Sequence, residues 1–318
     1  MGKKIRFAAQ TNRVVIRPSI KNETARLRKV VLGLADDFGG EPALEEAYDP
    51  KSKEHIKKGT FPSQEDVTRQ VMALETALRK YNVEIYRPND VKGVNQIFAR
   101  DIGLVIDDKF IVPNIIVERH QEVEALENII AQIPEENLLT SPDGVRMEGG
   151  DVMPWNDVIF VGYSKEEDFI NYKVSRTNEA GVEFLRKNFT NRNVIAVELT
   201  KSDNDPRKNA LHLDCTFQPI GNDKAIVFKE GFKYESDYQK IVAYFGIENL
   251  IHITREEMYR MNSNIFSISP EIIISGSSFT RLNGILRDMG FTVEEVDYDE
   301  VAKMEGLFRC STLPLVRE

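Results

Sequence analysis

The sequence is poor in cysteine, and it lacks long apolar runs and a surplus of basic residues. Two cysteines among 318 residues exclude a disulfide framework and suit a cytoplasmic protein with free thiols. No apolar run approaches the ~20 residues that span a bilayer, and no apolar segment follows the basic N-terminus, so we expect neither a membrane span nor a signal peptide. The net charge of −9 argues against nucleic acid as a main partner.

The residues that are present suffice for a large core. The composition is 41% hydrophobic and 29% charged, which suits one large domain or two. We expect residues 1–318 to form a single domain. Residues 35–62 are polar and rich in glycine and proline, and we expect them to form a long loop or flap inserted in that domain. The sequence leaves open whether the chain forms a homo-oligomer.

A strand-strand-helix-strand order recurs about five times along the chain. The first short strands are expected at residues 14–16 and 30–34, and a helix follows from Ser63, whose side chain can cap it with Asp66 at the third position. Repeats of roughly 50–60 residues predict an α/β propeller, a ring of five pseudo-symmetric ββαβ units around a centre. An open doubly wound α/β sheet is the alternative, but the paired short strands before each helix count against it.

Residues 146–151, R-M-E-G-G-D, place two acids beside a glycine pair. Glycines allow a positive φ and a close backbone approach, so Glu148 and Asp151 can point into a cavity. An ordinary turn before the apolar run at residues 158–161 is the plain structural alternative.

His212 and Asp214 lie two residues apart in a predicted strand over residues 211–219. A period of two places both side chains on one face, while Cys215 faces the other way and is expected to be structural. An imidazole beside a carboxylate is suited to proton transfer near neutral pH. A solvated strand face is the alternative.

Cys310 lies between Arg309 and Ser311 close to the C-terminus. A lone thiol is usually a small buried hydrophobe. Here a cationic neighbour can favour the thiolate, and one cysteine with a distant histidine and acid is the pattern of a covalent thiol enzyme.

Taken together, these motifs resemble the guanidino-group-modifying, or pentein, superfamily of arginine deiminases, dimethylarginine hydrolases and amidinotransferases. The motifs keep that superfamily's order from Asn95 onward: F-A-R-D at 98–101, E-G-G-D at 148–151, G-Y-S at 162–164 with R-T-N at 176–178, H-L-D at 212–214, and R-C-S-T-L-P-L at 309–315. The fivefold ββαβ repeat agrees with the fold of that superfamily.

The resemblance implies a role for each matching residue. Cys310 would be the nucleophile, His212 the acid and base, and Glu148 the partner that positions the histidine. Asp101 and Asp214 would grip the guanidinium, for which charge-assisted, bidentate pairing is well suited. Two further residues, Arg176 and Asn95, would hold a substrate α-carboxylate.

The implied function is a cysteine-dependent hydrolase that acts on the guanidino group of arginine or an arginine-like substrate. An S-amidino-cysteine intermediate would give a ureido product, citrulline, and ammonia, as in arginine deiminases. An amidinotransferase and a non-catalytic pentein binding protein are the alternatives. The partner implied is a small cationic guanidino compound. No cofactor is expected, and no metal either, because no Cys/His spacing suits zinc.

Overall fold

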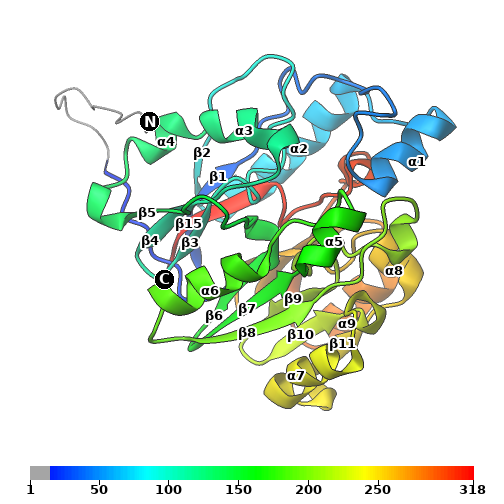
Figure 1. The fold of residues 1–318 in the computed structure, drawn as a ribbon. Coiled ribbons are helices and arrows are strands. Elements are labelled where there is room, and N and C mark those ends of the chain that lie inside the picture. The colour runs from blue at the N-terminus through cyan, green and yellow to red at the C-terminus, as the bar shows by residue number, and fades with distance from the viewer. Residues whose placement is uncertain (1–14) are drawn as a thin grey trace.

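The computed structural model describes residues 15–318 as five small three-stranded sheets. Each sheet contains an antiparallel pair and a third strand that runs parallel to the central one, in the orders β15-β1-β2, β3-β4-β5, β6-β7-β8, β9-β10-β11 and β12-β13-β14. A helical segment joins the central strand to the parallel strand of each unit. The helices lie toward the outside of the molecule and the strands inside (Figure 1). The prediction of five ββαβ repeats is therefore confirmed.

The strands are short. They are β1 Leu27–Leu32, β2 Glu84–Tyr86, β3 Leu104–Ile106, β4 Lys109–Val112, β5 Leu138–Thr140, β6 Val152–Trp155, β7 Val158–Tyr163, β8 Asn193–Glu198, β9 Phe217–Ile220, β10 Lys224–Val227, β11 Leu250–His252, β12 Phe266–Ser269, β13 Ile272–Gly276, β14 Thr292–Val296 and β15 Thr312–Arg317. The α-helices are α1 Pro50–Lys58, α2 Gln64–Lys80, α3 His120–Glu124, α4 Glu127–Ile130, α5 Glu166–Asn171, α6 Glu179–Asn188, α7 Glu235–Phe245, α8 Arg255–Tyr259 and α9 Thr280–Asp288.

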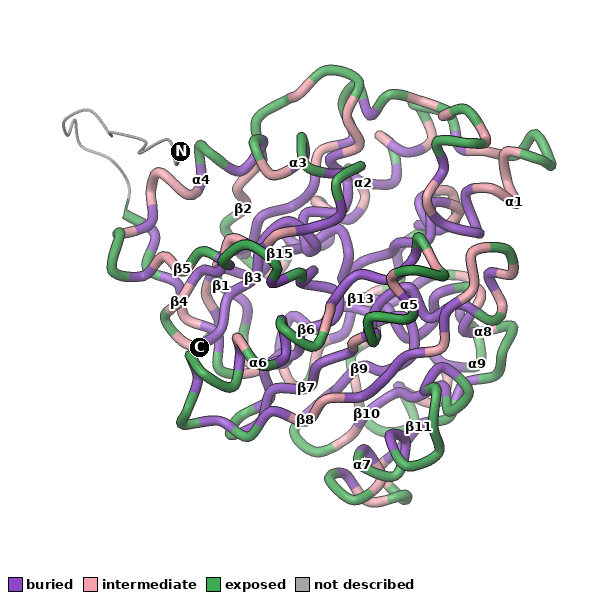
Figure 2. The backbone as a smooth tube through the Cα atoms, viewed as in Figure 1, coloured by how far each residue is buried: buried purple, intermediate pink, exposed green. Residues whose placement is uncertain are grey.

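Helix α2 shows how local signals place an element against the core. The Ser63 side chain accepts the backbone N–H of Asp66 and so caps the helix as predicted. Val67, Val71 and Leu74 recur at helical spacing and are buried in the largest apolar cluster. Figure 2 shows the same division across the molecule, with buried strands inside and exposed residues on the outer helices and loops. Among the described helices, none is long and apolar enough to cross a membrane.

The C-terminal strand closes the ring. β15 pairs antiparallel with β1, so the first sheet combines the two ends of the chain. The strand predicted at residues 14–16 is wrong for Val15 and Ile16, which lie in no strand, and Val14 lies outside the described residues. The antiparallel partner of β1 is β15, at the far end of the sequence, so a prediction from neighbouring segments cannot identify it. The closure places the residues just before β15 at the centre of the ring.

Residues 35–62, the flap, are only partly a loop. Residues 35–49 are irregular, but helix α1 follows, with Asp49 accepting the backbone N–H of Ser52 and Gly59 ending the helix at φ 63°. Pro50 stands in the first turn, where it has no hydrogen bond to lose. The prediction of a long loop is wrong for this half because a proline and a glycine taken as breakers mark the two ends of a helix.

Candidate active site

The side chains singled out in the sequence lie just before the first strand of successive repeats. Asp101 precedes β3, Glu148 precedes β6, His212 and Asp214 precede β9, and Cys310 precedes β15. All five residues are at least 97% buried. Because equivalent ends of the five units face the centre of the ring, segments far apart in sequence meet there.

His212 is held between two carboxylates. Its Nε2 lies 2.8 Å from Oε2 of Glu148, and its Nδ1 lies 3.8 Å from Oδ1 of Asp101. Burial works to lower the pKa of His212, but Asp101 and the hydrogen bond to Glu148 outweigh it and raise the pKa above its usual value. Burial likewise opposes the charge of Glu148, yet Arg176, His212 and Arg119 lower the pKa of that carboxyl. The imidazole is thus set to carry a proton.

The strand predicted over residues 211–219 is wrong for its first half, which contains His212 and Asp214. Residues 213–215 form a 3₁₀ turn, and β9 begins only at Phe217. The backbone N–H of Leu213 is donated to Oδ1 of Asp151 at 3.0 Å, which fixes the turn against the E-G-G-D segment. His212 and Asp214 therefore meet the site through a turn, and an alternation pattern alone cannot reveal that.

Asp214 and Cys310 meet beside a buried arginine. Oδ2 of Asp214 lies 3.7 Å from the Cys310 thiol and accepts a hydrogen bond from Nη1 of Arg309 at 2.9 Å. Burial, with Asp214 and Asp101, raises the pKa of Cys310 well above its usual value. The expectation that Arg309 favours the thiolate is thus wrong, because its guanidinium is engaged by Asp214 and Glu23. Burial and the two carboxylates thus favour the thiol form of Cys310 over the thiolate.

Arg176 and Asn95 lie at different edges of the site. The Arg176 side chain is buried, its Nη1 is 3.7 Å from Oε1 of Glu148, and none of its three nitrogens has a hydrogen-bond partner among the described residues. Its guanidinium lies 5.4 Å from the ring centre of Tyr48, on the flap. Asn95 lines the cavity above the site, and its Oδ1 accepts the backbone N–H of Ile97.

A residue that the sequence analysis did not single out, Arg119, occupies the acidic cluster. Its Nη1 lies 2.8 Å from Oδ2 of Asp101 and 3.3 Å from Oε2 of Glu148. On the other edge of the guanidinium, Nε and Nη2 donate to the two carboxylate oxygens of Glu122 at 2.8 and 2.6 Å. The only signal is an arginine and a glutamate three residues apart, a spacing common on any helix. The carboxylates at the centre of the ring already bind a guanidinium, supplied by the protein itself.

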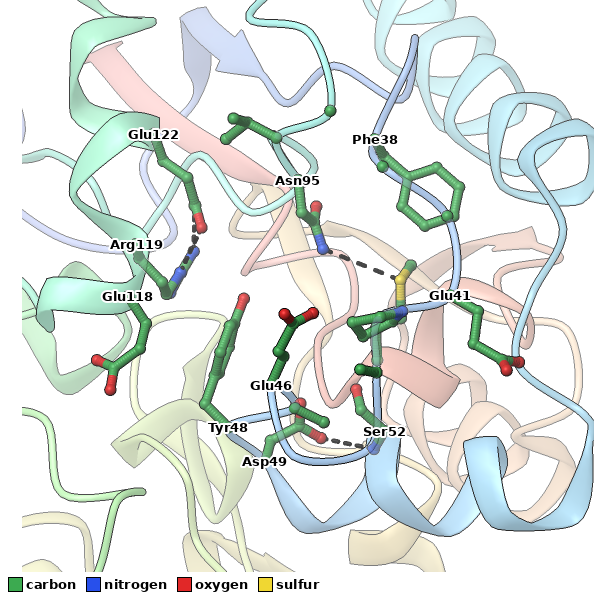
Figure 3. Close-up of a pocket in the computed structure, with 18 of the residues that line it drawn as sticks. Phe38, Glu41, Glu46, Tyr48, Asp49, Ser52, Asn95, Glu118, Arg119 and Glu122 are labelled. Atoms are coloured by element: carbon green, nitrogen blue, oxygen red, sulfur yellow. Dashed lines mark hydrogen bonds and ion pairs between the residues drawn. The ribbon is translucent and has the colours of Figure 1, made fainter.

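A cavity of about 380 Å³ ends at Arg119. Figure 3 shows Tyr48 and Asp49 entering it from the flap, with Arg119 and Glu122 on one side and Asn95 above. The cavity is acidic, since its lining includes Glu41, Glu46, Asp49, Glu118 and Glu122. Arg119 therefore stands between this acidic vestibule and the buried cluster.

The second glycine of E-G-G-D is required by the histidine. A Cβ on Gly150 would lie 2.7 Å from Cγ and Nδ1 of His212 and 2.9 Å from Oδ1 of Asp101. We expect Gly150→Ala to displace the imidazole and to lower kcat by about 100-fold, the order of loss for a misplacement near 1 Å. The measurement is steady-state kinetics on the purified variant.

Gly284 provides the matched control for this prediction. It lies in α9, and a Cβ there would meet nothing within 4 Å. Gly284→Ala should keep full activity and stabilise the fold by roughly 0.5–1 kcal/mol. Equal activity of the two variants would contradict the packing argument.

The same cluster contains the one group in the described chain with metal-ligand spacing. Ligand atoms of Asp101, Glu148 and His212 lie within 4.8 Å of one another. Two of the three, however, already contact the Arg119 guanidinium, and His212 contacts both carboxylates. The residues fit a bound organic cation, and the expectation of no metal stays a prediction.

Solved structures share this fold at low sequence identity. The N-terminal domain of ArgZ, described as an arginine dihydrolase from the ornithine-ammonia cycle in Cyanobacteria, has a TM-score of 0.75 and 18% identity, over 91% of this chain and 97% of that domain. SxtG, described as an amidinotransferase from Microseira wollei, has a TM-score of 0.73 and 17% identity, over 95% and 97% of the two chains. The fold is that of the guanidino-group-modifying pentein superfamily.

Within that class, residues 43–317 match the family model described as N,N dimethylarginine dimethylhydrolase, eukaryotic, and the chain belongs to this family. The uncharacterized protein YkgA of Bacillus subtilis (strain 168) is 26% identical over 298 residues, 93% of this chain and 94% of YkgA. The arginine deiminase of Streptococcus uberis (strain ATCC BAA-854 / 0140J) is 25% identical over 206 residues, 55% of this chain. The chain matches only 48% of the length of that deiminase.

Proposed function

We propose that the protein is a cysteine-dependent hydrolase that converts the guanidino group of arginine, or of an arginine-like compound, into a ureido group and ammonia. The observation that carries this proposal is the Arg119 guanidinium bound between Asp101 and Glu148 in a buried cluster that also contains His212. Two buried carboxylates need cationic partners, and a planar guanidinium can bind two carboxylates at once. In the proposal, the substrate takes the place that Arg119 occupies.

Unpartnered atoms support a further ligand in the cluster. Oδ1 of Asp101 and Nδ1 of His212 are buried without a hydrogen-bond partner among the described residues. Buried polar atoms are rarely left so. A substrate guanidinium that donates to Asp101 would satisfy the carboxylate and bring the guanidino carbon close to Cys310.

Substrate binding would also activate the nucleophile. The Cys310 thiol is kept neutral by burial and by Asp214 and Asp101, which raise its pKa. A substrate cation between these groups reverses that balance and favours the thiolate. Asp214 would share its carboxylate between Arg309 and the substrate, since only Oδ2 is bound by Arg309.

The reaction then proceeds in two balanced halves. Once substrate binding has released the Cys310 proton to solvent, the thiolate attacks the guanidino carbon and forms an S–C bond. Protonated His212 gives its proton to the departing nitrogen, the C–N bond breaks, and ammonia leaves. His212 next takes a proton from water, the water oxygen attacks the same carbon, and the S–C bond breaks with its electron pair returning to sulfur. Glu148 fixes the imidazole through the 2.8 Å hydrogen bond.

Arg176 is the candidate for holding the tail of the substrate. Its three nitrogens have no hydrogen-bond partner among the described residues, and its guanidinium lies 5.4 Å from the ring centre of Tyr48, so movement of the flap would expose a buried cation. A substrate carboxylate is the ligand that such a guanidinium favours. Asn95, at the cavity wall, would contribute its amide.

A product assay tests the proposal. The purified protein is incubated with L-arginine, agmatine and methylated arginines, and ureido product and ammonia are measured, with Cys310→Ala as the control. We expect citrulline and ammonia in equal amounts from arginine, and none from the control.

The other outcomes are equally distinct. Ornithine that appears only with an amine acceptor such as glycine would replace the hydrolase with an amidinotransferase. Turnover of the methylated arginines alone would overturn arginine as substrate. No product in any arm would contradict the proposal and favour a non-catalytic binding protein.

A further inference from the structure

Asn264 occupies, in the fourth sheet-to-sheet connection, the position that carries a reactive group in the other repeats. It lies just before β12, as Asp101, Glu148 and Cys310 lie just before β3, β6 and β15. It is fully buried. The ring therefore directs this amide to the same centre as the cluster described above.

The orientation of the Asn264 amide is fixed by the cysteine loop. Its Oδ1 accepts the backbone N–H groups of Arg309 and Cys310, at 3.0 and 3.2 Å. Two donors identify the oxygen, so the nitrogen must point the other way. Nδ2 lies 3.2 Å from Sγ of Cys310.

We propose that Asn264 is a catalytic residue that donates a hydrogen bond to the Cys310 sulfur and stabilises the thiolate. This rests on the proposed function only in making that thiolate the nucleophile. The sulfur has an acceptor on one side, Oδ2 of Asp214 at 3.7 Å, which suits a thiol and repels a thiolate. Asn264 is the side-chain donor to this sulfur among the described residues, and the backbone N–H of Leu307 adds to it by lowering the pKa of Cys310.

The donor acts twice in the reaction. It stabilises the sulfur before the S–C bond forms, and it stabilises the same atom when that bond breaks and the electron pair returns. Hydrogen bonds to a charged acceptor are stronger than those to a neutral one, so the amide favours the thiolate over both the thiol and the adduct.

Asn264→Leu separates this role from a structural one. Leucine is similar in shape, adds no charge and cannot donate to the sulfur, whereas an aspartate would raise the pKa of Cys310 by charge repulsion alone. In a Cys215→Ala background, the rate of alkylation of Cys310 by iodoacetamide is followed against pH. We expect the midpoint to rise by about one to two pH units, so that alkylation near pH 7 slows roughly 10- to 100-fold.

The direction in which the alkylation midpoint moves shows whether Asn264 acts as a donor to sulfur. A purely structural asparagine would leave a looser, better-solvated thiol, and the midpoint would fall toward the ordinary cysteine value or stay where it is; either result overturns the proposal. Altered access alone changes the plateau of the rate and not its midpoint. Alkylation needs no substrate, so the outcome is independent of whether any guanidino compound is turned over.

A second measurement tests the proposal if Asn264→Leu fails to fold. The side-chain amide of Asn264 is observed by ¹⁵N NMR in the Cys215→Ala protein while Cys310 is titrated, with a Cys310→Ala protein as the control. We expect the Nδ2 proton signals to move with ionisation of the thiol and to stay fixed in the control. Signals that move equally in both proteins would contradict the hydrogen bond.

Discussion

Replacement of Cys310 by alanine is expected to abolish hydrolysis, with kcat reduced by about 10⁴-fold or more. The sulfur is the proposed atom that forms the covalent bond, and residues that act as a unit with a nucleophile cannot replace it. Binding should survive, because in the proposal Asp101 and Glu148 hold the substrate guanidinium independently of the thiol. The measurement pairs turnover of arginine with calorimetric titration of the variant.

The second cysteine is the matched control. Cys215 is buried and its thiol lies 3.7 Å from Oδ1 of Asp214, on the same carboxylate that meets Cys310. We expect Cys215→Ala to retain activity within about tenfold, since no step uses this sulfur. Loss of turnover in Cys215→Ala with activity kept in Cys310→Ala would invert the assignment.

Replacement of Arg309 by leucine is expected to cause the largest loss of stability, about 3–5 kcal/mol. Arg309 is fully buried and binds Glu23 at 3.1 and 3.2 Å and Asp214 at 2.9 Å. It also donates to the backbone carbonyls of Gly149 and Val152. Removal of the guanidinium leaves two buried carboxylates without their partner. Urea unfolding at neutral pH measures the loss.

The pH dependence of this variant gives a signed check. Burial alone would raise the pKa of Glu23, but Arg309 and Arg100 outweigh it and lower the pKa below about 4.5. A lowered pKa contributes stability that is present above the usual glutamate value and is lost as the pH falls through the folded value. Without Arg309, burial should raise the pKa of Glu23 above its usual value, so protonation of Glu23 no longer costs stability. The variant should therefore lose less stability on acidification than the native protein.

An exposed arginine controls for the loss of charge alone. Arg287 pairs with Glu295 at 2.5 Å, but half of its side chain is exposed. Such pairs contribute roughly 0–1 kcal/mol, so Arg287→Leu should change stability little. Similar losses in the two variants would contradict the buried-network account.

The five repeats could be predicted from sequence because each is a local pattern. Short apolar runs, helix caps and turn residues recur within one unit, and α2 begins where Ser63 places it. The closing pair β1-β15 joins the two ends of the chain, and no local pattern encodes such a pairing. The helix in the flap was missed because Pro50 and Gly59 are caps as well as breakers.

The residues of the candidate site also fall into those that the sequence predicts and those that only the structure reveals. Cys310 and His212 are rare residue types and Glu148 lies in a recognisable motif, so the sequence alone predicted that the three residues share one site. Arg119 and Asn264 are common types without a motif, and the roles proposed for them rest on contacts of 2.8 and 3.2 Å with groups 18 and 46 residues away. The register of the repeats, with polar residues just before each first strand, is the signal that could have found Asn264.

The state of the thiol required the structure as well. Arg309 next to Cys310 in sequence favours a thiolate, but its side chain points to Asp214 and Glu23. Residues adjacent in sequence can direct their side chains to different partners, and Arg309 directs its charge away from Cys310. Burial and two nearby acids raise the pKa of the cysteine, so in the proposed mechanism the substrate cation takes part in the activation.

Trapping the covalent intermediate tests the central claim most directly. The protein is mixed with arginine, quenched in acid within one turnover, digested and examined by mass spectrometry. The account predicts an adduct on the Cys310 peptide with the mass of arginine less ammonia, and no adduct on Cys215. An adduct of the amidino group alone would identify transfer or loss of the whole tail. Full turnover with both cysteines unmodified would contradict covalent catalysis by Cys310.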